Sequence, residues 1–209
     1  MYALFFSFLW GCGESLNKNP TDLPVEIEVI EEEEEEPFEF EVLPHDVLPM
    51  YPGIQASADC GQFVGQKPCN IILEDQNGEW FQLYDHVGKV ILLDFSTGWC
   101  GPCIRAAGTV QEIQDLYEDE GFIYVTIMIE DNQQNETTTE FIQQWATTYG
   151  IVTAPILIGS RDLIDYNSIE GWNLISWPTF YIIDRDMKIH SGIRGYSEEL
   201  IHQEVQEVI

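Results

Sequence analysis

Two cysteines, Cys100 and Cys103, stand two residues apart directly after an apolar stretch of the chain. The stretch, residues 90–95, is apolar except for Asp94, which is the pattern of a central parallel strand buried on both faces. If a helix opens at the cysteines, its unpaired N–H groups and its dipole stabilise a Cys100 thiolate and lower the pKa of that thiol. Cys103, one helical turn later, can then attack a mixed disulfide formed at Cys100. The pair predicts redox chemistry, with Cys100 as an exposed nucleophile and Cys103 as the resolving thiol.

Residues 99–103, Trp-Cys-Gly-Pro-Cys, match the active-site motif of thioredoxin. Asp94 lies six residues before Cys100, where thioredoxins carry a buried aspartate. Residues 176–180, Ser-Trp-Pro-Thr-Phe, precede an apolar strand, as the cis-proline loop of that family does. The chain therefore resembles the thioredoxin superfamily over roughly residues 70–209, and its hairpin and insertion resemble the exported, membrane-anchored TlpA/ResA type.

The resemblance implies a role for each of these residues. Asp94 would accept and donate the proton of Cys103, with a pKa raised by desolvation. A carboxylate that is simply satisfied by a neighbouring hydroxyl is the alternative for this position. Pro178 is predicted to be cis, in a loop that lines the substrate groove. The predicted substrate-binding residues are Trp99, Gly101, Pro102, Trp177 and Pro178.

The implied fold is α/β, a thioredoxin fold with a central mixed β-sheet flanked by helices. An N-terminal hairpin is predicted from residues 71–73 and 80–83, which an Asp-Gln-Asn-Gly turn connects. An insertion before the cis-proline loop holds a strand candidate at residues 155–158 and a short helix near residues 162–166.

Apolar spacing and capping residues predict the remaining elements. Residues 110–117 keep helical spacing until Gly121, with an interruption at Gly108. Thr137 with Glu140 forms a candidate capping box for the next helix, and Ser197 caps the last one. The predicted strands after the cysteine pair are residues 122–129, 180–183 and 187–193.

The chain is strongly acidic, with 37 Asp and Glu against 8 Lys and Arg, and a formal net charge of −29. No basic patch is visible, which excludes nonspecific nucleic-acid binding. The acidic surface indicates solubility, a salty habitat or a basic partner.

The first segment, residues 1–12, indicates export. Residues 2–10 are almost wholly apolar, and Leu9-Trp10-Gly11-Cys12 resembles the lipobox of a bacterial lipoprotein, in which the cysteine is acylated. The segment is too short to span a membrane. No basic residue precedes it and Trp10 is bulky for its position, so a plain secretory signal and no signal at all remain alternatives.

Residues 13–50 form an acidic linker that we expect to be disordered. The segment is rich in Pro and Glu, with six consecutive glutamates at residues 31–36, and cannot bury enough surface to offset the entropy of ordering. Charge repulsion should extend it, so it would tether a folded domain, residues 51–209, to a lipid at Cys12.

Cys60 and Cys69 lie in a segment that contains Gly and Pro, without a helix start beside them. No cluster of His or Cys nearby completes a zinc site. We expect a structural disulfide that closes a short loop in an exported protein, with a second redox pair as the alternative.

These features predict a thiol–disulfide oxidoreductase that reduces disulfides of exported client proteins through a mixed disulfide. Its partners would be those clients, a redox partner that resets the cysteine pair, and a membrane reached through Cys12. A peroxiredoxin-like thiol peroxidase is an alternative, since Thr97 precedes Cys100 by three residues, although Leu93 stands where a proline is expected. A redox-inert binding lipoprotein is another.

No cofactor or metal is predicted. The sequence has no phosphate-binding glycine loop and no Cys-x-x-Cys-His motif. The four histidines show no metal or triad spacing and are predicted to lie at the surface: His45, His86, His190 and His202.

Overall fold

The computed structural model describes residues 53–55, 60–165 and 171–209, which all belong to one compact unit that spans residues 44–209. The predicted lipobox with Cys12, the linker 13–50 and the domain start at residue 51 lie outside the described residues. Within the described part, no helix is both long enough and apolar enough to cross a membrane.

A mixed sheet lies at the centre of these described ranges. Its five strands are β4 (Val90–Thr97), β5 (Phe122–Glu130), β6 (Ile156–Ile158), β7 (Thr179–Ile183) and β8 (Ile189–Arg194), in the order β6-β5-β4-β7-β8. The central strand β4 runs parallel to β5 and antiparallel to β7. Every residue of β4 is buried, which explains its continuous apolar sequence. The predicted central mixed sheet is confirmed.

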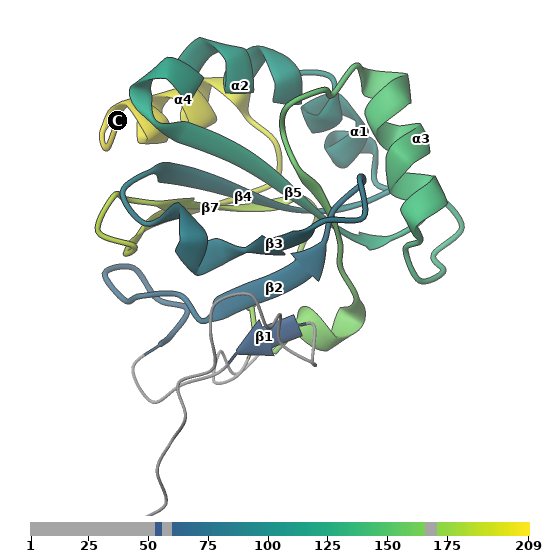
Figure 1. The fold of residues 1–209 in the computed structure, drawn as a ribbon, viewed down its shortest axis with the longest axis horizontal. Coiled ribbons are helices and arrows are strands. Elements are labelled where there is room, and N and C mark those ends of the chain that lie inside the picture. The colour runs from purple at the N-terminus through teal and green to yellow at the C-terminus, as the bar shows by residue number, and fades with distance from the viewer. Residues whose placement is uncertain (1–52, 56–59, 166–170) are drawn as a thin grey trace, which may run out of the picture. The chain divides into compact units, whose positions relative to one another are not determined.

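Helices cover one face of this sheet (Figure 1). The α-helices of the described part are α1 (Gly101–Ala107), α2 (Val110–Tyr117), α3 (Thr139–Tyr149) and α4 (Glu198–Gln206). One apolar cluster contains side chains from all of them, including Ala106, Ile113, Trp145 and Ile201. In the strand order, β5 lies next to β4 and β6 lies beyond β5, so both parallel connections run in the same direction across the sheet. Because such connections are right-handed, the helices α1 and α2 between β4 and β5 and the helix α3 between β5 and β6 lie on the same face.

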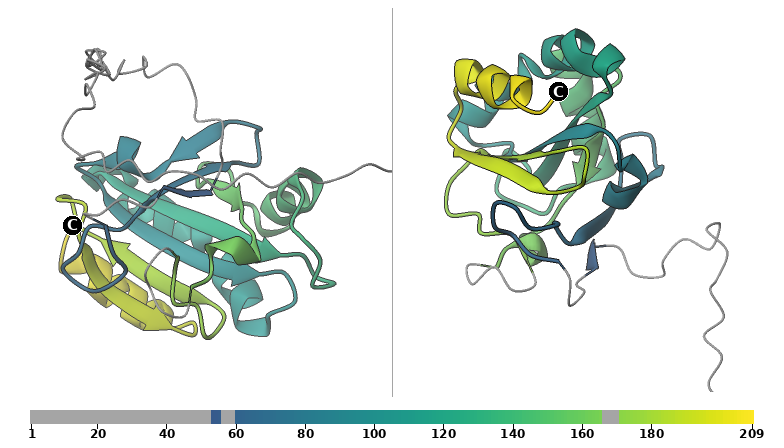
Figure 2. Two further views of the ribbon diagram at one scale, coloured as in Figure 1. Left: turned by 90° about the horizontal axis from the view of Figure 1, so that it is seen from below. Right: turned by 90° about the vertical axis from the view of Figure 1, so that its left-hand side faces the viewer.

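A second, antiparallel sheet lies on the opposite face (Figures 1 and 2). It consists of β1 (Gly53–Gln55), β2 (Asn70–Glu74) and β3 (Trp80–Gln82). The β2–β3 pair is the predicted hairpin. Phe81 of this sheet, Phe95 of β4 and the fully buried Trp172 belong to the second apolar cluster. The hairpin sheet therefore buries the face of the central sheet that the α-helices do not cover.

Most local predictions are confirmed, with small shifts. Gly108 separates α1 from α2, and Ser197 caps α4 by accepting a hydrogen bond from the N–H of Leu200. The N-cap of α3 is Thr138, whose hydroxyl accepts from the N–H of Phe141 at 3.2 Å. The predicted cap at Thr137 is wrong by one residue, because the Thr137 side chain is buried and does not cap the helix.

The insertion is also present. The strand β6 confirms the predicted strand at residues 155–158, beginning one residue later than expected. The predicted short helix is a 3₁₀ turn, Arg161–Leu163, which begins one residue earlier than expected.

Candidate active site

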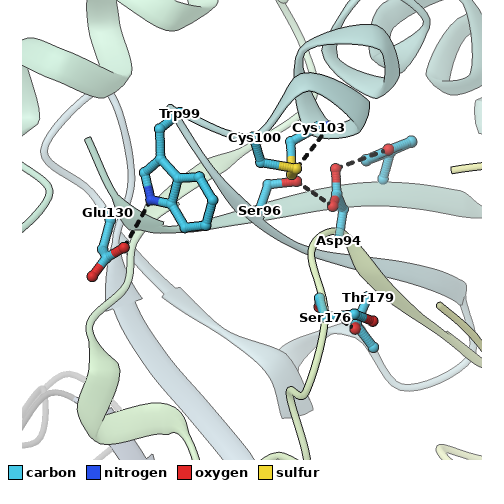
Figure 3. The surroundings of a disulfide bond; sticks show 9 residues. Asp94, Ser96, Trp99, Cys100, Cys103, Glu130, Ser176 and Thr179 are labelled. Atoms are coloured by element: carbon cyan, nitrogen blue, oxygen red, sulfur yellow. Dashed lines mark hydrogen bonds between the residues drawn. A yellow bond between two sulfur atoms is a disulfide. The ribbon is translucent and has the colours of Figure 1, made fainter. Parts of the chain in front are cut away.

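Cys100 and Cys103 form a disulfide at the start of α1 (Figure 3). Cys100 is the N-cap residue, and its Sγ accepts a hydrogen bond from the backbone N–H of Cys103 at 3.2 Å. Pro102 lies in the first turn, where the helix needs no N–H donor. After reduction, the N–H donor of Cys103 would favour the thiolate form of Cys100.

The nucleophile is less accessible than predicted. The exposed fraction of Cys100 is 5% and that of Cys103 is 1%. The expectation of an exposed Cys100 is therefore wrong for the oxidised pair, because its sulfur is bonded to Cys103 and turned toward the backbone of α1. Trp99, directly before Cys100, is 40% exposed and offers an accessible apolar side chain next to the disulfide.

Asp94 is buried in β4, and two hydroxyl groups hold its carboxylate. Ser96 Oγ donates to Oδ1 at 2.6 Å, and the Tyr124 hydroxyl donates to Oδ2 at 3.1 Å. Burial raises the pKa of Asp94 to about 7, and both hydrogen bonds oppose this rise. An acid with such a pKa can both take up and release a proton near neutral pH.

The two donors come from different strands. Ser96 is two residues after Asp94, so both side chains leave β4 on the same face. Figure 3 shows Ser96 and Asp94 below the disulfide in this view, with the serine hydroxyl directed at the carboxylate. Tyr124 comes from β5, and its burial together with the charge of Asp94 raises its pKa well above the usual value. Tyr124 therefore stays protonated and acts as a fixed donor.

The indole ring of Trp99 is hydrogen-bonded to Glu130, the last residue of β5. The indole Nε1–H of Trp99 donates to Glu130 Oε2 at 2.8 Å (Figure 3). The other carboxylate oxygen accepts from Nε of Arg161 and forms an ion pair with it. The Glu130 side chain is only 6% exposed, so its charge is compensated by these two partners.

The loop before β7 completes the site. The Trp177–Pro178 bond is cis, as the motif predicts. The Thr179 hydroxyl donates to the carbonyl of Ser176 at 2.8 Å, and the N–H of Gly195 donates to the carbonyl of Pro178 at 2.8 Å. The Trp177 side chain is partly buried and packs against the second apolar cluster.

The sequence profile of the AhpC/TSA family matches residues 64–191, which is more than half of the chain. The chain belongs to the AhpC/TSA family. Thioredoxin-like protein YneN of Bacillus subtilis is 31% identical over 132 residues, which cover 61% of this chain and 71% of that protein. Thiol-disulfide oxidoreductase ResA of Geobacillus thermodenitrificans is 25% identical over 146 residues, which cover 69% of this chain and 78% of the relative.

Solved structures share the fold of this AhpC/TSA domain. The exposed lipoprotein thioredoxin Etrx1 of Streptococcus pneumoniae superposes with a TM-score of 0.55 at 23% identity, covering 66% of this chain and 99% of that one. The thioredoxin domain of a thiol-disulfide oxidoreductase from Bacteroides vulgatus gives 0.57 at 17% identity, covering 70% and 99%. The family match and the ResA relatives together identify the protein as a thiol–disulfide oxidoreductase of the thioredoxin-like class, and the solved structures show that it shares their fold.

Two further cysteines in the described part of the AhpC/TSA chain form a second disulfide. Cys60 and Cys69 are bonded, with Cα atoms 4.8 Å apart, and Cys69 is fully buried immediately before β2. Neither residue starts a helix, in contrast to Cys100. This geometry fits a structural cross-link that fixes the loop in front of the hairpin sheet.

One group in the described part has the composition of a cation site. His190 of β8 lies 3.7 Å from Glu204 and 3.3 Å from Glu207 at the end of α4. The three side chains are partly exposed, and the contacts between His190 and the two carboxylates account for their proximity.

Sequence reasoning missed the partners of the predicted site residues. Ser96 had a usable signal, since it is the second polar side chain on the same face of β4 as Asp94. Tyr124 and Glu130 had none, because each lies about 30 residues from its partner and meets it only through the pairing of β4 with β5.

Proposed function

We propose that this protein reduces disulfides of exported client proteins through the Cys100–Cys103 dithiol. The observation that carries the proposal is the position of the pair, with Cys100 at the N-cap of α1, its sulfur facing the N–H of Cys103, and Asp94 buried close by in β4.

The reaction consists of two thiol–disulfide exchanges. The Cys100 thiolate attacks one sulfur of a client disulfide, and the other client sulfur leaves as a thiolate and takes up a proton. Cys103 then loses its proton and attacks the Cys100 sulfur, which releases the second client sulfur as a thiolate that is also protonated. The client gains two electrons and two protons, and the pair ends as the disulfide seen in the structure.

Asp94 is the proposed proton acceptor for Cys103. Its pKa of about 7 supports this role, because the carboxylate is present in substantial amounts at neutral pH and is a stronger base than an ordinary aspartate. Ser96 and Tyr124 would orient the carboxylate through the two hydrogen bonds already described.

Clients would bind across the apolar surface around the disulfide. We infer that Trp99, Gly101, Pro102 and the loop at Trp177 and Pro178 contact an extended client segment. Ile175, which is 60% exposed beside that loop, adds an apolar contact that the sequence did not indicate.

We further propose that the protein is exported and anchored through a lipid on Cys12, with residues 13–50 as a tether. The apolar start of the chain and the lipobox-like residues before Cys12 support this proposal, as does the fold shared with an exposed lipoprotein thioredoxin. A membrane or exported redox partner must then return two electrons and two protons to the pair in each cycle.

Trapping tests the proposed chemistry. With insulin as the disulfide substrate, a Cys103→Ser variant should accumulate a mixed disulfide through Cys100, because the resolving thiol is absent. A Cys100→Ser variant should form no adduct and should lose insulin reduction. Absence of an adduct from both variants would favour the redox-inert alternative, and hydrogen peroxide consumption faster than insulin reduction would favour the thiol peroxidase.

A further inference from the structure

Glu130 is a buried carboxylate at the edge of the active site that the proposed chemistry does not use. Its side chain is 6% exposed, yet it carries a charge in a region of low dielectric. Each carboxylate oxygen accepts a hydrogen bond from a specific partner, one from the indole N–H of Trp99 and the other from the guanidinium of Arg161. A buried ion pair of this kind is often no more stabilising than an apolar residue of similar volume. Packing alone therefore does not explain why a glutamate occupies this position.

The main chain of Glu130 holds the same loop. Its carbonyl accepts a hydrogen bond from the N–H of Gly98 at 2.8 Å, one residue before Trp99. The contact is close, because a Cβ atom on Gly98 would lie 2.7 Å from the backbone N of Asn132 and 2.5 Å from the ring of Phe141. Glu130 therefore fixes both the backbone and the side chain of the residues that lead into Cys100.

Arg161 connects this contact to a distant part of the chain. It belongs to the 3₁₀ turn that follows β6 in the insertion, and its side chain is 60% exposed. An exposed guanidinium that pairs with a buried carboxylate offsets the charge of Glu130 from the solvent side. The insertion is thus linked to the active-site tryptophan by an ion pair and one hydrogen bond.

We infer that Glu130 is a positioning residue for client binding, which holds the indole of Trp99 beside Cys100 with Arg161 as its counter-ion. The inference rests on the proposed function, since it assigns the fixed indole to the recognition of polypeptide clients. A large aromatic side chain that is ordered before binding loses less entropy on contact, and Trp is prominent among residues that dominate binding energy. Small disulfides, which reach the sulfur without covering Trp99, do not need this contact.

Two Glu130 variants separate hydrogen bonding from charge. Glu130→Leu removes both interactions at similar volume, whereas Glu130→Gln keeps an oxygen that can accept from the indole N–H. The KM for insulin should rise about three- to tenfold in Glu130→Leu and less in Glu130→Gln, which is the range expected for losing one pre-ordered side chain. The KM for a small aromatic disulfide, 5,5′-dithiobis(2-nitrobenzoate), should stay the same. Glu118→Gln, which changes the exposed C-cap residue of α2, is the matched control for the loss of one negative charge.

A Trp99→Phe background shows whether Glu130 acts through the indole. In that background, Glu130→Leu should raise the KM for insulin no further. An additional rise of the same size, or an equal loss with the small disulfide, would overturn the inference and leave Glu130 a structural residue.

The indole N–H resonance of Trp99 gives a readout that needs no activity. It should shift and broaden in Glu130→Leu and move less in Glu130→Gln, because the hydrogen bond fixes the ring. An unchanged resonance in Glu130→Leu would contradict the positioning role even if the chain proved not to reduce protein disulfides. If the Trp99 resonance of the wild-type chain is that of a hydrogen-bonded indole N–H but the chain reduces no insulin, the result contradicts the proposed function and leaves the positioning role of Glu130 intact.

Discussion

Asp94 is the residue whose surroundings have the largest effect on the proposed mechanism. Desolvation in the buried strand disfavours the charged carboxylate and raises the pKa of Asp94. The hydrogen bonds from the hydroxyls of Ser96 and Tyr124 reverse only part of this rise. The result is a carboxyl group that titrates near neutral pH, as the proposed proton acceptor requires, rather than a permanent charge.

The pH dependence of the reaction should report this carboxyl group. If Asp94 must be ionised to accept the proton of Cys103, insulin reduction rises with pH through about 7, the pKa of that group. In Ser96→Ala the loss of a donor raises the Asp94 pKa further, so the inflection should move upward by about one pH unit. In Asp94→Asn this inflection should vanish. Profiles of kcat/KM between pH 5 and 9 measure the inflection in the wild type, Ser96→Ala and Asp94→Asn. The same inflection in Ser96→Ala as in the wild type would show that the hydrogen bond from Ser96 does not act on the titrating group.

Stability of the oxidised protein should depend on the same group. The folded state keeps the Asp94 proton up to about pH 7, whereas an unfolded aspartate loses it near pH 3.8. Between these values the folded state binds more protons, so this group lowers the free energy of unfolding as the pH rises, by at most about 4 kcal/mol. Asp94→Asn should therefore be more stable than wild type at pH 8, with a smaller difference at pH 5. Urea unfolding at the two pH values measures this, and a constant difference would exclude a raised pKa.

Among the elements, the turn from β4 to α1 is the most tightly constrained. Gly98 sits where the backbone of the β5–α3 connection and the ring of Phe141 leave no space for a side chain. The identity of this residue is set by packing against a neighbouring connection and not by its own dihedral angles.

Substitution of this glycine should destabilise the fold. Gly98→Ala places a methyl group against backbone atoms, and overpacking of this kind costs about 1–3 kcal/mol of unfolding free energy. Gly101→Ala is the matched control, because a Cβ there meets no atom within 4 Å and alanine is the better helix former. Urea unfolding midpoints compare the two variants, and equal stability of Gly98→Ala and wild type would show that the connection can move aside.

The loop before β2 depends on the second disulfide. The bond between Cys60 and Cys69 closes a short loop, and its removal should cost about 2–3 kcal/mol through the unfolded chain. The Cys60→Ala/Cys69→Ala double variant should therefore unfold at lower urea concentration but keep the reduction potential of Cys100–Cys103. A second reversible couple in the wild-type chain that disappears in the double variant would instead support the alternative of a second redox pair.

For the molecule as a whole, sequence patterns predicted what is local and missed what depends on strand pairing. Three features are predictable from a few neighbouring residues: the continuous apolar run of β4, the Cys-Gly-Pro-Cys helix start and the cis Trp-Pro bond. The structure confirms all three and the fold that they predict. The contacts of Asp94 with Tyr124 and of Trp99 with Glu130 follow from the register of β4 against β5, which no local pattern contains. The packing of the four described α-helices on one face depends on the strand order, which is equally non-local.

The reduction potential of the Cys100–Cys103 pair tests the central claim most directly. We expect a reversible two-electron couple with a strongly negative value, near the value of about −270 mV found for thioredoxin, as a protein that reduces client disulfides requires. The measurement is an equilibration of the full chain against dithiothreitol buffers, with the thiols counted after alkylation. A potential above about −180 mV, where disulfide isomerases and oxidants lie, would contradict the assignment as a reductase.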